Sequence, residues 1–123
     1  MAKALGIGGV FFKSSDPERL AEWYRVWLGI KLNSTGRGAC FYPSELPHQA
    51  YSVWSPVEDT TDYLAPSDSR FMINLVVDEL DGALSQVVEG GADLVGEPEE
   101  NEYGRFGWFV DPDGNKVELW QMR

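Results

Sequence analysis

Glu118 is the side chain of this sequence that is best placed to do chemistry. It lies in residues 116–120, where polar or amphipathic residues alternate with apolar ones, as they do in a strand with two different faces. Lys116, Glu118 and Trp120 share one face of the predicted strand, and Val117 and Leu119 share the other. A carboxylate can serve as a general base or as a metal ligand. Its position beside Trp120 within a strand suggests that it faces a pocket.

A tight turn precedes this strand. Residues 106–110 form another strand-like run, and Pro112, Asp113 and Gly114 supply turn-forming side chains between the two runs. The pattern therefore predicts that the strand of Glu118 is the second arm of a hairpin.

A helix is predicted over residues 17–28, after a strand-like run at residues 5–12. Ser15 or Asp16 can cap this helix, Pro17 favours its first turn, and Gly29 can end it. Apolar residues recur at the spacing of an amphipathic helix, at Leu20, Trp23, Tyr24, Trp27 and Leu28.

The second half of the chain repeats this order. A strand is predicted at residues 71–77 and a helix at residues 80–88, with Asp78 as the cap and Gly90 and Gly91 as the stop. Strand-like segments follow each helix, at residues 31–32, 38–42 and 50–54 and then at residues 93–95, 106–110 and 116–120. We expect two duplicated βαβββ modules, about 1–57 and 69–123, which together form one domain of residues 1–123. Residues 55–70 connect them.

Composition limits the possible functions. The 123 residues carry 20 acidic and 10 basic side chains, a net charge of -10, which disfavours binding to nucleic acid or to an anionic membrane. The single cysteine, Cys40, excludes an intrachain disulfide and a multi-cysteine zinc site. We expect it to be a small buried residue. No signal peptide or membrane span is predicted, so a reducing cytoplasm is the expected location.

In this order of elements, the sequence resembles the vicinal oxygen chelate superfamily, which includes glyoxalase I, bleomycin- and fosfomycin-resistance proteins and extradiol dioxygenases. The similarity covers nearly the whole chain, and the Asp-Pro-Asp-Gly-Asn turn followed by Glu-Leu is its most specific part. The matching residues are Ser15-Asp16, Trp23-Tyr24, Leu28-Gly29, Val77-Asp78-Glu79-Leu80-Asp81, Gly90-Gly91-Ala92, Asp111-Pro112-Asp113-Gly114-Asn115 and Glu118-Leu119.

The resemblance implies an α+β fold in which two βαβββ modules form curved mixed sheets around a cleft, with the helices outside. It also implies a divalent metal in most active members, and Glu118 matches the C-terminal carboxylate ligand. The two ligand positions in the opening strands fall at Gly9 and Met72, however, and neither side chain suits a hard divalent ion. A divalent metal is therefore possible but disfavoured. His48, in a turn-rich segment, is expected to be an exposed loop residue, with recruitment as a ligand as the alternative.

Strand alternation identifies candidates that face the cleft. Phe11, Met72, Asn74, Glu118 and Trp120 form an apolar and aromatic set with few polar groups, as is usual in a small-molecule pocket. Further candidates suited to stacking on an aromatic ligand or to pairing with a carboxylate are Tyr51, Trp54, Tyr103, Arg105 and Trp108. For each aromatic side chain, packing in the core is an equally good interpretation. Arg105 could instead pair with Glu118 or with the acidic stretch at residues 97–102, which is expected to be a solvated loop.

Three functions fit these features. The first is a protein that binds a small, flat, aromatic and perhaps cationic molecule in a cleft without the usual complete metal site. The second is a lyase, isomerase or dioxygenase-type enzyme that uses Glu118 as a base or as a metal anchor. The third is an accessory module with a vestigial cleft. Members of the resembling family of this size commonly pair, so we also expect a homodimer.

Overall fold

The sheet of this protein is built by the second half of the chain. The computed structural model describes residues 1–3 and 5–123 and contains one mixed five-stranded sheet. The strands are β1 (Ile73–Val76), β2 (Asp93–Leu94), β3 (Glu99–Asn101), β4 (Gly104–Val110) and β5 (Lys116–Met122). Their order is β1-β5-β4-β2, with β3 also paired to β4, and only β1 and β5 run parallel. The α+β class is confirmed, and the sheet is open.

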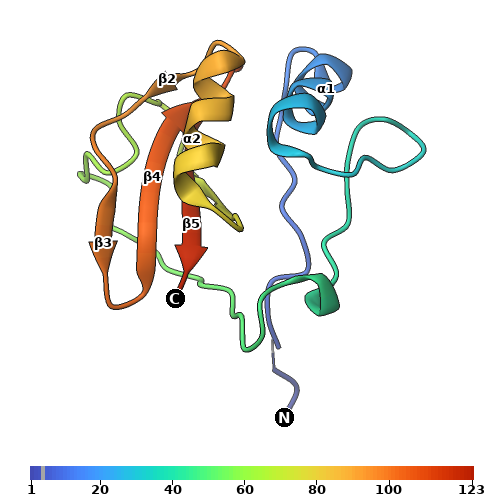
Figure 1. Cartoon of the computed structure of the whole chain (residues 1–123). Coiled ribbons are helices and arrows are strands. Elements are labelled where there is room, and N and C mark those ends of the chain that lie inside the picture. Colours follow the sequence, from blue (N-terminus) through green and yellow to red (C-terminus); the bar gives the residue numbers. More distant parts are fainter. Residues whose placement is uncertain (4) are drawn as a thin grey trace.

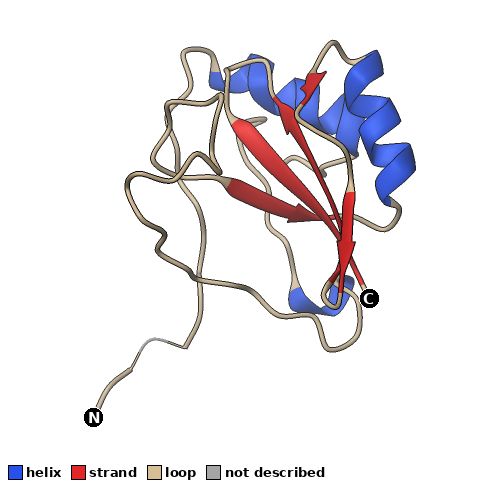
Figure 2. Cartoon of the chain, turned by 90° about the vertical axis from the view of Figure 1, so that its left-hand side faces the viewer, coloured by secondary structure: helices blue, strands red, loops and turns tan. Residues whose placement is uncertain are grey.

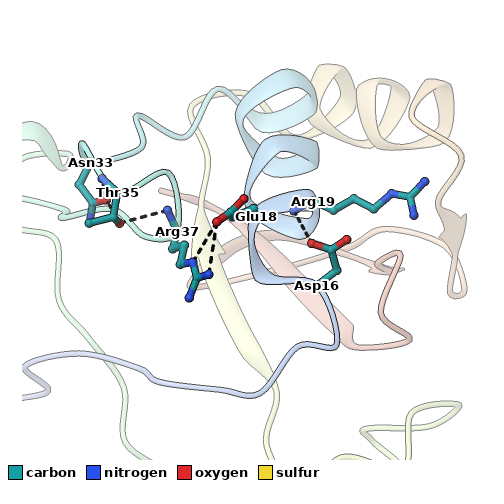
Figure 3. Close-up of polar contacts among 6 residues, drawn as sticks. All are labelled: Asp16, Glu18, Arg19, Asn33, Thr35 and Arg37. Carbon is teal, nitrogen blue, oxygen red and sulfur yellow. Dashed lines mark hydrogen bonds and ion pairs between the residues drawn. The ribbon is translucent and has the colours of Figure 1, made fainter.

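Two helices form at the positions that the sequence predicts. They are α1 (Pro17–Leu28) and α2 (Leu80–Glu89). The Asp16 carboxylate accepts a 3.2 Å hydrogen bond from the Arg19 amide at the start of α1, as Figure 3 shows, and Gly29 ends the helix with φ of 66°. At α2 the expected cap is wrong by one residue, because Glu79 accepts from the Gly82 amide in place of Asp78.

The core lies between α2 and one face of the sheet, with α1 alongside α2 (Figure 1). Helix α2 packs closely on β4 at Gly107. The Leu84 side chain of α2 occupies the space that a side chain at position 107 would need. Two hydrogen bonds also join the helices, each from a side chain of one helix to a main-chain carbonyl at the C-terminal end of the other. The Trp23 indole donates to the Gly90 carbonyl at 2.9 Å, and the Gln86 amide donates to the Trp27 carbonyl at 2.8 Å. The largest fully buried side chains are Leu80, Val87, Phe109, Val117 and Leu119.

The predicted hairpin between β4 and β5 is confirmed, and it is tied to the first half of the chain. Asp111 is buried, and its carboxylate accepts from the Asp113 and Asn115 amides at 2.9 Å each. The same carboxylate accepts a 2.8 Å hydrogen bond from the Tyr24 hydroxyl of α1. The turn motif therefore also fixes the position of α1 relative to the sheet.

The first half differs from the prediction. Strands were expected at residues 5–12, 31–32, 38–42 and 50–54, but within the described residues this half contains only α1 and the short 3-10 helix η1 (Pro43–Glu45). Figure 2 shows these segments as loops. An alternating sequence pattern indicates that a segment could form a strand with two different faces. A strand forms, however, only where a neighbouring strand pairs with its backbone, and the pattern does not specify that neighbour. Large apolar side chains are consequently exposed here, among them Phe11, Phe41 and Trp54.

Local contacts order parts of this half. The Asn33 amide donates to the Gly38 carbonyl at 2.7 Å, which closes a turn. Arg37 reaches from this turn to Glu18 on α1 at 3.3 Å (Figure 3). Cys40, expected to be buried, is exposed. Within the described residues, no helix has the length and apolar character needed to cross a membrane.

The acidic stretch at residues 97–102 also differs from the prediction of a loop. Residues Glu99–Asn101 form the edge strand β3, although all three side chains are exposed as expected. Three consecutive polar residues carry no alternating pattern, so the strand depends on its pairing with β4.

Candidate functional site

A row of polar and aromatic side chains crosses the sheet on the face away from α2. The register pairs Asn74 of β1 with Glu118 of β5, and Glu118 with Trp108 of β4. Neighbours across a sheet point to the same side, so these three side chains lie together. Because Val117 and Leu119 enter the helix-covered core, the predicted assignment of faces along β5 is confirmed. We call the set Asn74, Trp108, Lys116, Glu118 and Trp120 the site face.

Glu118 is the centre of the site face. Its side chain is buried, with a relative exposure of 8% for the residue. The Asn74 amide donates to one carboxylate oxygen at 2.6 Å, and the Trp108 indole N–H donates to the other at 2.7 Å. The Tyr63 hydroxyl donates to that second oxygen as well. Three donors compensate the burial of this charge, which would otherwise be costly.

Tyr63 reaches the site face from residues 55–70, the segment that connects the two halves of the chain. In Figure 1 this green segment passes behind the sheet, on the side away from α2. The Tyr63 ring lies edge-on to Trp108, with the centroids 6.2 Å apart and an interplanar angle of 87°. Burial and the neighbouring Glu118 carboxylate raise the pKa of the Tyr63 hydroxyl. The phenol therefore keeps its proton at neutral pH and donates a hydrogen bond to Glu118.

Lys116 holds the same tyrosine from its other end. Its ammonium group donates to the Tyr63 main-chain carbonyl and lies 5.0 Å from the centroid of the Tyr63 ring. The ammonium group is also 5.9 Å from the Trp108 ring. Lys116 is buried, so these aromatic faces and the carbonyl replace part of its hydration.

Trp120 forms an aromatic wall beside this row. It stacks on Phe106, with centroids 5.4 Å apart and an interplanar angle of 18°, and Tyr51 from the first half meets it edge-on at 5.4 Å. The Trp120 indole donates to the Tyr103 carbonyl at 2.9 Å, while the Tyr103 residue is largely exposed. Of the predicted candidates, the fold thus gathers Tyr51, Asn74, Trp108, Glu118 and Trp120.

Other candidates lie elsewhere. Phe11 and Trp54 have relative exposures of 98% and 80%, and Met72 is partly buried just before β1. Arg105 pairs with Asp81 of α2 at 2.9 Å, so it makes neither of the ion pairs considered from the sequence, with Glu118 or with the acidic stretch. Register places Arg105 opposite Gln121, on the other face of the sheet from Glu118.

Sequence reasoning missed Tyr63 and Lys116 as parts of the site. Alternation along the strand places Lys116 on the face of Glu118, but Lys116 was not counted among the candidate residues. Tyr63 offered no such signal, because it belongs to a connection without periodicity, where a side chain's contacts depend on the path of the loop.

Two surface hollows occur away from the site face. One, of about 350 Å³, is lined by residues 43, 44 and 46–50 and includes His48, which is exposed as expected. The other, of about 510 Å³, is lined by residues of the turns before α1 and β5. Neither hollow is lined by Tyr63 or by a residue of the site face.

Comparisons with known proteins agree with this architecture. The chain matches the model of the Glyoxalase-like domain over residues 9–120, and it therefore belongs to that family. The resemblance inferred from the sequence is thus confirmed.

Solved structures add several relatives. A member of the glyoxalase/bleomycin resistance protein/dioxygenase superfamily from Sphaerobacter thermophilus DSM 20745 is 36% identical over 40% of each chain, with a TM-score of 0.36. TnmS3, an antibiotic binding protein from Streptomyces sp. CB03234, is 33% identical over 42% of this chain and 41% of its own, with a TM-score of 0.37. The match thus spans less than half the length of these two relatives.

A protein of unknown function from Agrobacterium tumefaciens str. C58 matches the fold over 98% of this chain and all of its own, with 21% identity and a TM-score of 0.55. No curated protein sequence matches the chain significantly.

The residues present do not fit the divalent metal that the superfamily implies. Both oxygens of Glu118 already accept from N–H or O–H groups, and an indole or amide N–H is not a metal donor. Gly9 and Met72 occupy the other expected positions. Within residues 1–3 and 5–123, no three His, Cys, Asp or Glu side chains are grouped as metal ligands.

Proposed function

We propose that this protein binds a small, flat, aromatic molecule on its site face, without a complete metal site. The observation that carries the proposal is the buried carboxylate of Glu118, which lies opposite Trp108, on the same face of β5 as Trp120, and accepts only from neutral donors. Broad aromatic surface with a few fixed polar groups is typical of sites for small organic ligands. The negative charge of the chain and of Glu118 favours neutral or cationic ligands over anionic ones.

Isothermal titration against a panel of neutral and cationic aromatic compounds tests this proposal. We expect at least one compound to bind, and Glu118→Gln to weaken its binding about tenfold, because the charged hydrogen-bond acceptor is lost. Glu99→Gln is the matched control, since Glu99 is exposed on β3, and it should leave the affinity unchanged. Absence of binding across the whole panel would contradict the proposal.

An enzyme that uses Glu118 as a base or as a metal anchor is the alternative. It has less support, because a carboxylate whose lone pairs accept from Asn74, Trp108 and Tyr63 is poorly placed to take a proton from a substrate. Any substrate found by turnover would separate the two functions. If Glu118→Gln abolished turnover while substrate still bound, the enzyme would be favoured.

Metal binding is tested separately from ligand binding. We expect the melting temperature to stay the same after treatment with EDTA and after addition of Mn²⁺ or Zn²⁺, because binding to the folded state alone would raise it. A metal-dependent rise that Glu118→Gln removes would favour the metal-anchor alternative.

We further propose that the chain works as a homodimer, in the cytoplasm. Its accessible surface is 9374 Å², whereas a monomeric protein of 13.8 kDa is expected to expose about 6,600 Å². The excess of about 2,800 Å² is of the size that each chain loses in a large obligate dimer. Much of it belongs to strand-like segments of the first half whose apolar side chains lack a cover, and a second copy is the proposed occupant of these surfaces.

A further inference from the structure

Tyr63 lies against the site face and contacts three of its residues, Trp108, Lys116 and Glu118. It is not part of any helix or strand, and it contacts the site face at both ends. Its hydroxyl donates to Glu118, its ring lies edge-on to Trp108, and its main-chain carbonyl accepts from Lys116. Tyr63 thus presents a hydroxyl, an aromatic ring and a carbonyl to Glu118, Trp108 and Lys116, respectively.

The contact is also suited to release. Tyr63 retains a relative exposure of 43%, and nearly all of residues 55–70 are exposed. Apart from the bond that the Tyr63 carbonyl accepts from Lys116, the backbone hydrogen bonds of this segment are short-range turns, such as the 3.1 Å bond from the Thr61 amide to the Glu58 carbonyl. Segments with few buried contacts open at low free energy compared with a core strand. Tyr63 can therefore leave the site face without disruption of the sheet.

We propose that Tyr63 is an internal occupant of the site and that the natural ligand displaces it. The ligand class is a planar aromatic molecule with a hydroxyl group at one end and a hydrogen-bond acceptor, such as a carbonyl, at the other. This inference rests on the proposed function, since it specifies the ligand of the same site.

Each part of the ligand has a partner on the site face. The hydroxyl donates to the Glu118 carboxylate, which is a strong acceptor because it is charged. The ring packs perpendicular to Trp108 and lies below the Lys116 ammonium, and the cation favours an electron-rich ring such as that of a phenol. The acceptor takes the ammonium hydrogen bond that Tyr63 now receives. An aromatic molecule without a hydroxyl would leave one Glu118 acceptor position unfilled.

The test removes the Tyr63 side chain by substitution and adds a soluble tyrosine derivative in its place. The probe is N-acetyl-L-tyrosinamide, and N-acetyl-L-phenylalaninamide is the same compound without the hydroxyl. We expect Tyr63→Ala to bind the tyrosine probe about tenfold or more tightly than the natural sequence does, because a competing internal group is gone. We expect the same variant to prefer it to the phenylalanine probe by about tenfold or more, the effect of one charged hydrogen bond.

Tyr42→Ala is the matched control, since Tyr42 is an exposed tyrosine that makes no hydrogen bond to the site face. It should bind both probes as the natural sequence does. Tyr63→Phe is the second test variant, because it keeps the ring and loses only the donor to Glu118, and it too should bind the tyrosine probe more tightly. The indole N–H signal of Trp108, assigned by Trp108→Phe, should shift when the probe binds.

The outcomes separate this inference from the proposed function. If Tyr63→Ala binds the two probes equally, or no better than the natural sequence does, the inference is overturned, and a panel compound that still binds leaves the proposed function intact. Should Tyr63→Ala fail to fold, absence of a gain in Tyr63→Phe overturns it equally. If no probe and no panel compound binds, both proposals fail.

Discussion

At the residue scale, Glu118 is the group on which the site depends. Its carboxylate is buried and accepts from an amide, an indole and a phenol that come from β1, β4 and the connecting segment. The two donors from strands, Asn74 and Trp108, stabilise this buried carboxylate, since the loss of either leaves an acceptor position without a protein partner. The site is therefore sensitive to single substitutions that remove one of these donors.

Trp108→Phe removes one of these donors while it keeps an aromatic ring. We expect the free energy of unfolding to fall by about 1–3 kcal/mol, because a buried charged acceptor loses its 2.7 Å partner. Urea denaturation measures this change. Trp54→Phe is the control, since Trp54 is 80% exposed, and it should alter the stability by less than about 0.5 kcal/mol. Equal effects of both substitutions would contradict this account of Glu118.

Tyr24 provides a pH-dependent test of a second buried contact. Burial, together with the Asp111 carboxylate that accepts its hydrogen bond, raises the pKa of the Tyr24 hydroxyl above its ordinary value of 10.0. Above pH 10 the unfolded chain releases this proton and the folded chain keeps it. The unfolded state then binds fewer protons, so stability is lost as the pH rises.

We expect Tyr24→Phe to remove this contribution to alkaline unfolding. Between pH 10 and 11.5, the stability of the natural sequence should fall more steeply than that of the variant, by up to about 1.4 kcal/mol per pH unit. Urea denaturation at a series of pH values measures both slopes. Identical slopes would show that Tyr24 ionises equally in the folded and unfolded states.

At the scale of elements, the sheet and α2 form the scaffold that holds the site. The helix covers the face of Phe109, Val117 and Leu119, so the opposite face is left for Glu118 and its neighbours. The Asp111 turn sets the register of β4 against β5 and thereby places Trp108 beside Glu118. The arrangement of the site thus depends on the register of the β4–β5 hairpin and on the packing of α2 against the opposite face of the sheet.

Gly107→Ala tests the packing of α2 on β4. A methyl group at Gly107 would lie 2.9 Å from a terminal carbon of Leu84, which is itself buried. We expect a loss of about 1–3 kcal/mol of stability in urea denaturation, as for other overpacked cores. Gly8→Ala, at a position with open space around it, should have little effect.

A second change can separate overpacking from loss of backbone freedom. Leu84→Val shortens the obstructing side chain, so the double variant should lose less than the sum of the two single effects. Simple additivity of the two would refute the steric explanation.

At the scale of the whole molecule, the two halves of the chain contrast sharply. The second half has a sheet and a buried core, whereas the described residues of the first half form α1, the short η1 and extended segments with exposed apolar side chains. The helix of the first half is nonetheless fixed to the second, through Tyr24 and Trp23. The uncovered surface therefore belongs to the strand-like segments, and this is the surface that we assign to a second copy.

Light scattering at micromolar concentration should give about twice the chain mass of 13.8 kDa. Phe11→Glu combined with Trp54→Glu should shift the protein towards monomers, because two fully or largely exposed aromatic side chains would become charged. Val88→Ser is the control, since Val88 is half-exposed on α2 within the sheet-forming half. A monomeric mass for the natural sequence would refute the dimer.

The sequence by itself determined the features that depend on neighbours along the chain. Helix caps and apolar spacing located α1 and α2, the Asp-Pro-Asp-Gly-Asn turn predicted the hairpin, and alternation placed Glu118 and Trp120 on one face. The family resemblance rests on the same local features. Each of these signals depends only on residues that are close together along the chain, so it can be recognised in a single sequence.

Only the tertiary structure decided which groups meet from distant positions. The donation from Tyr63 to Glu118 joins residues 55 positions apart, and Arg105 turned to Asp81 rather than to Glu118. Among residues 1–3 and 5–123, the strand-like segments of the first half pair with no strand, although their sequence pattern is that of paired strands. Periodicity specifies which side of an element faces inward but not what lies against it, because a partner is selected by competition among all surfaces that the folded chain brings together.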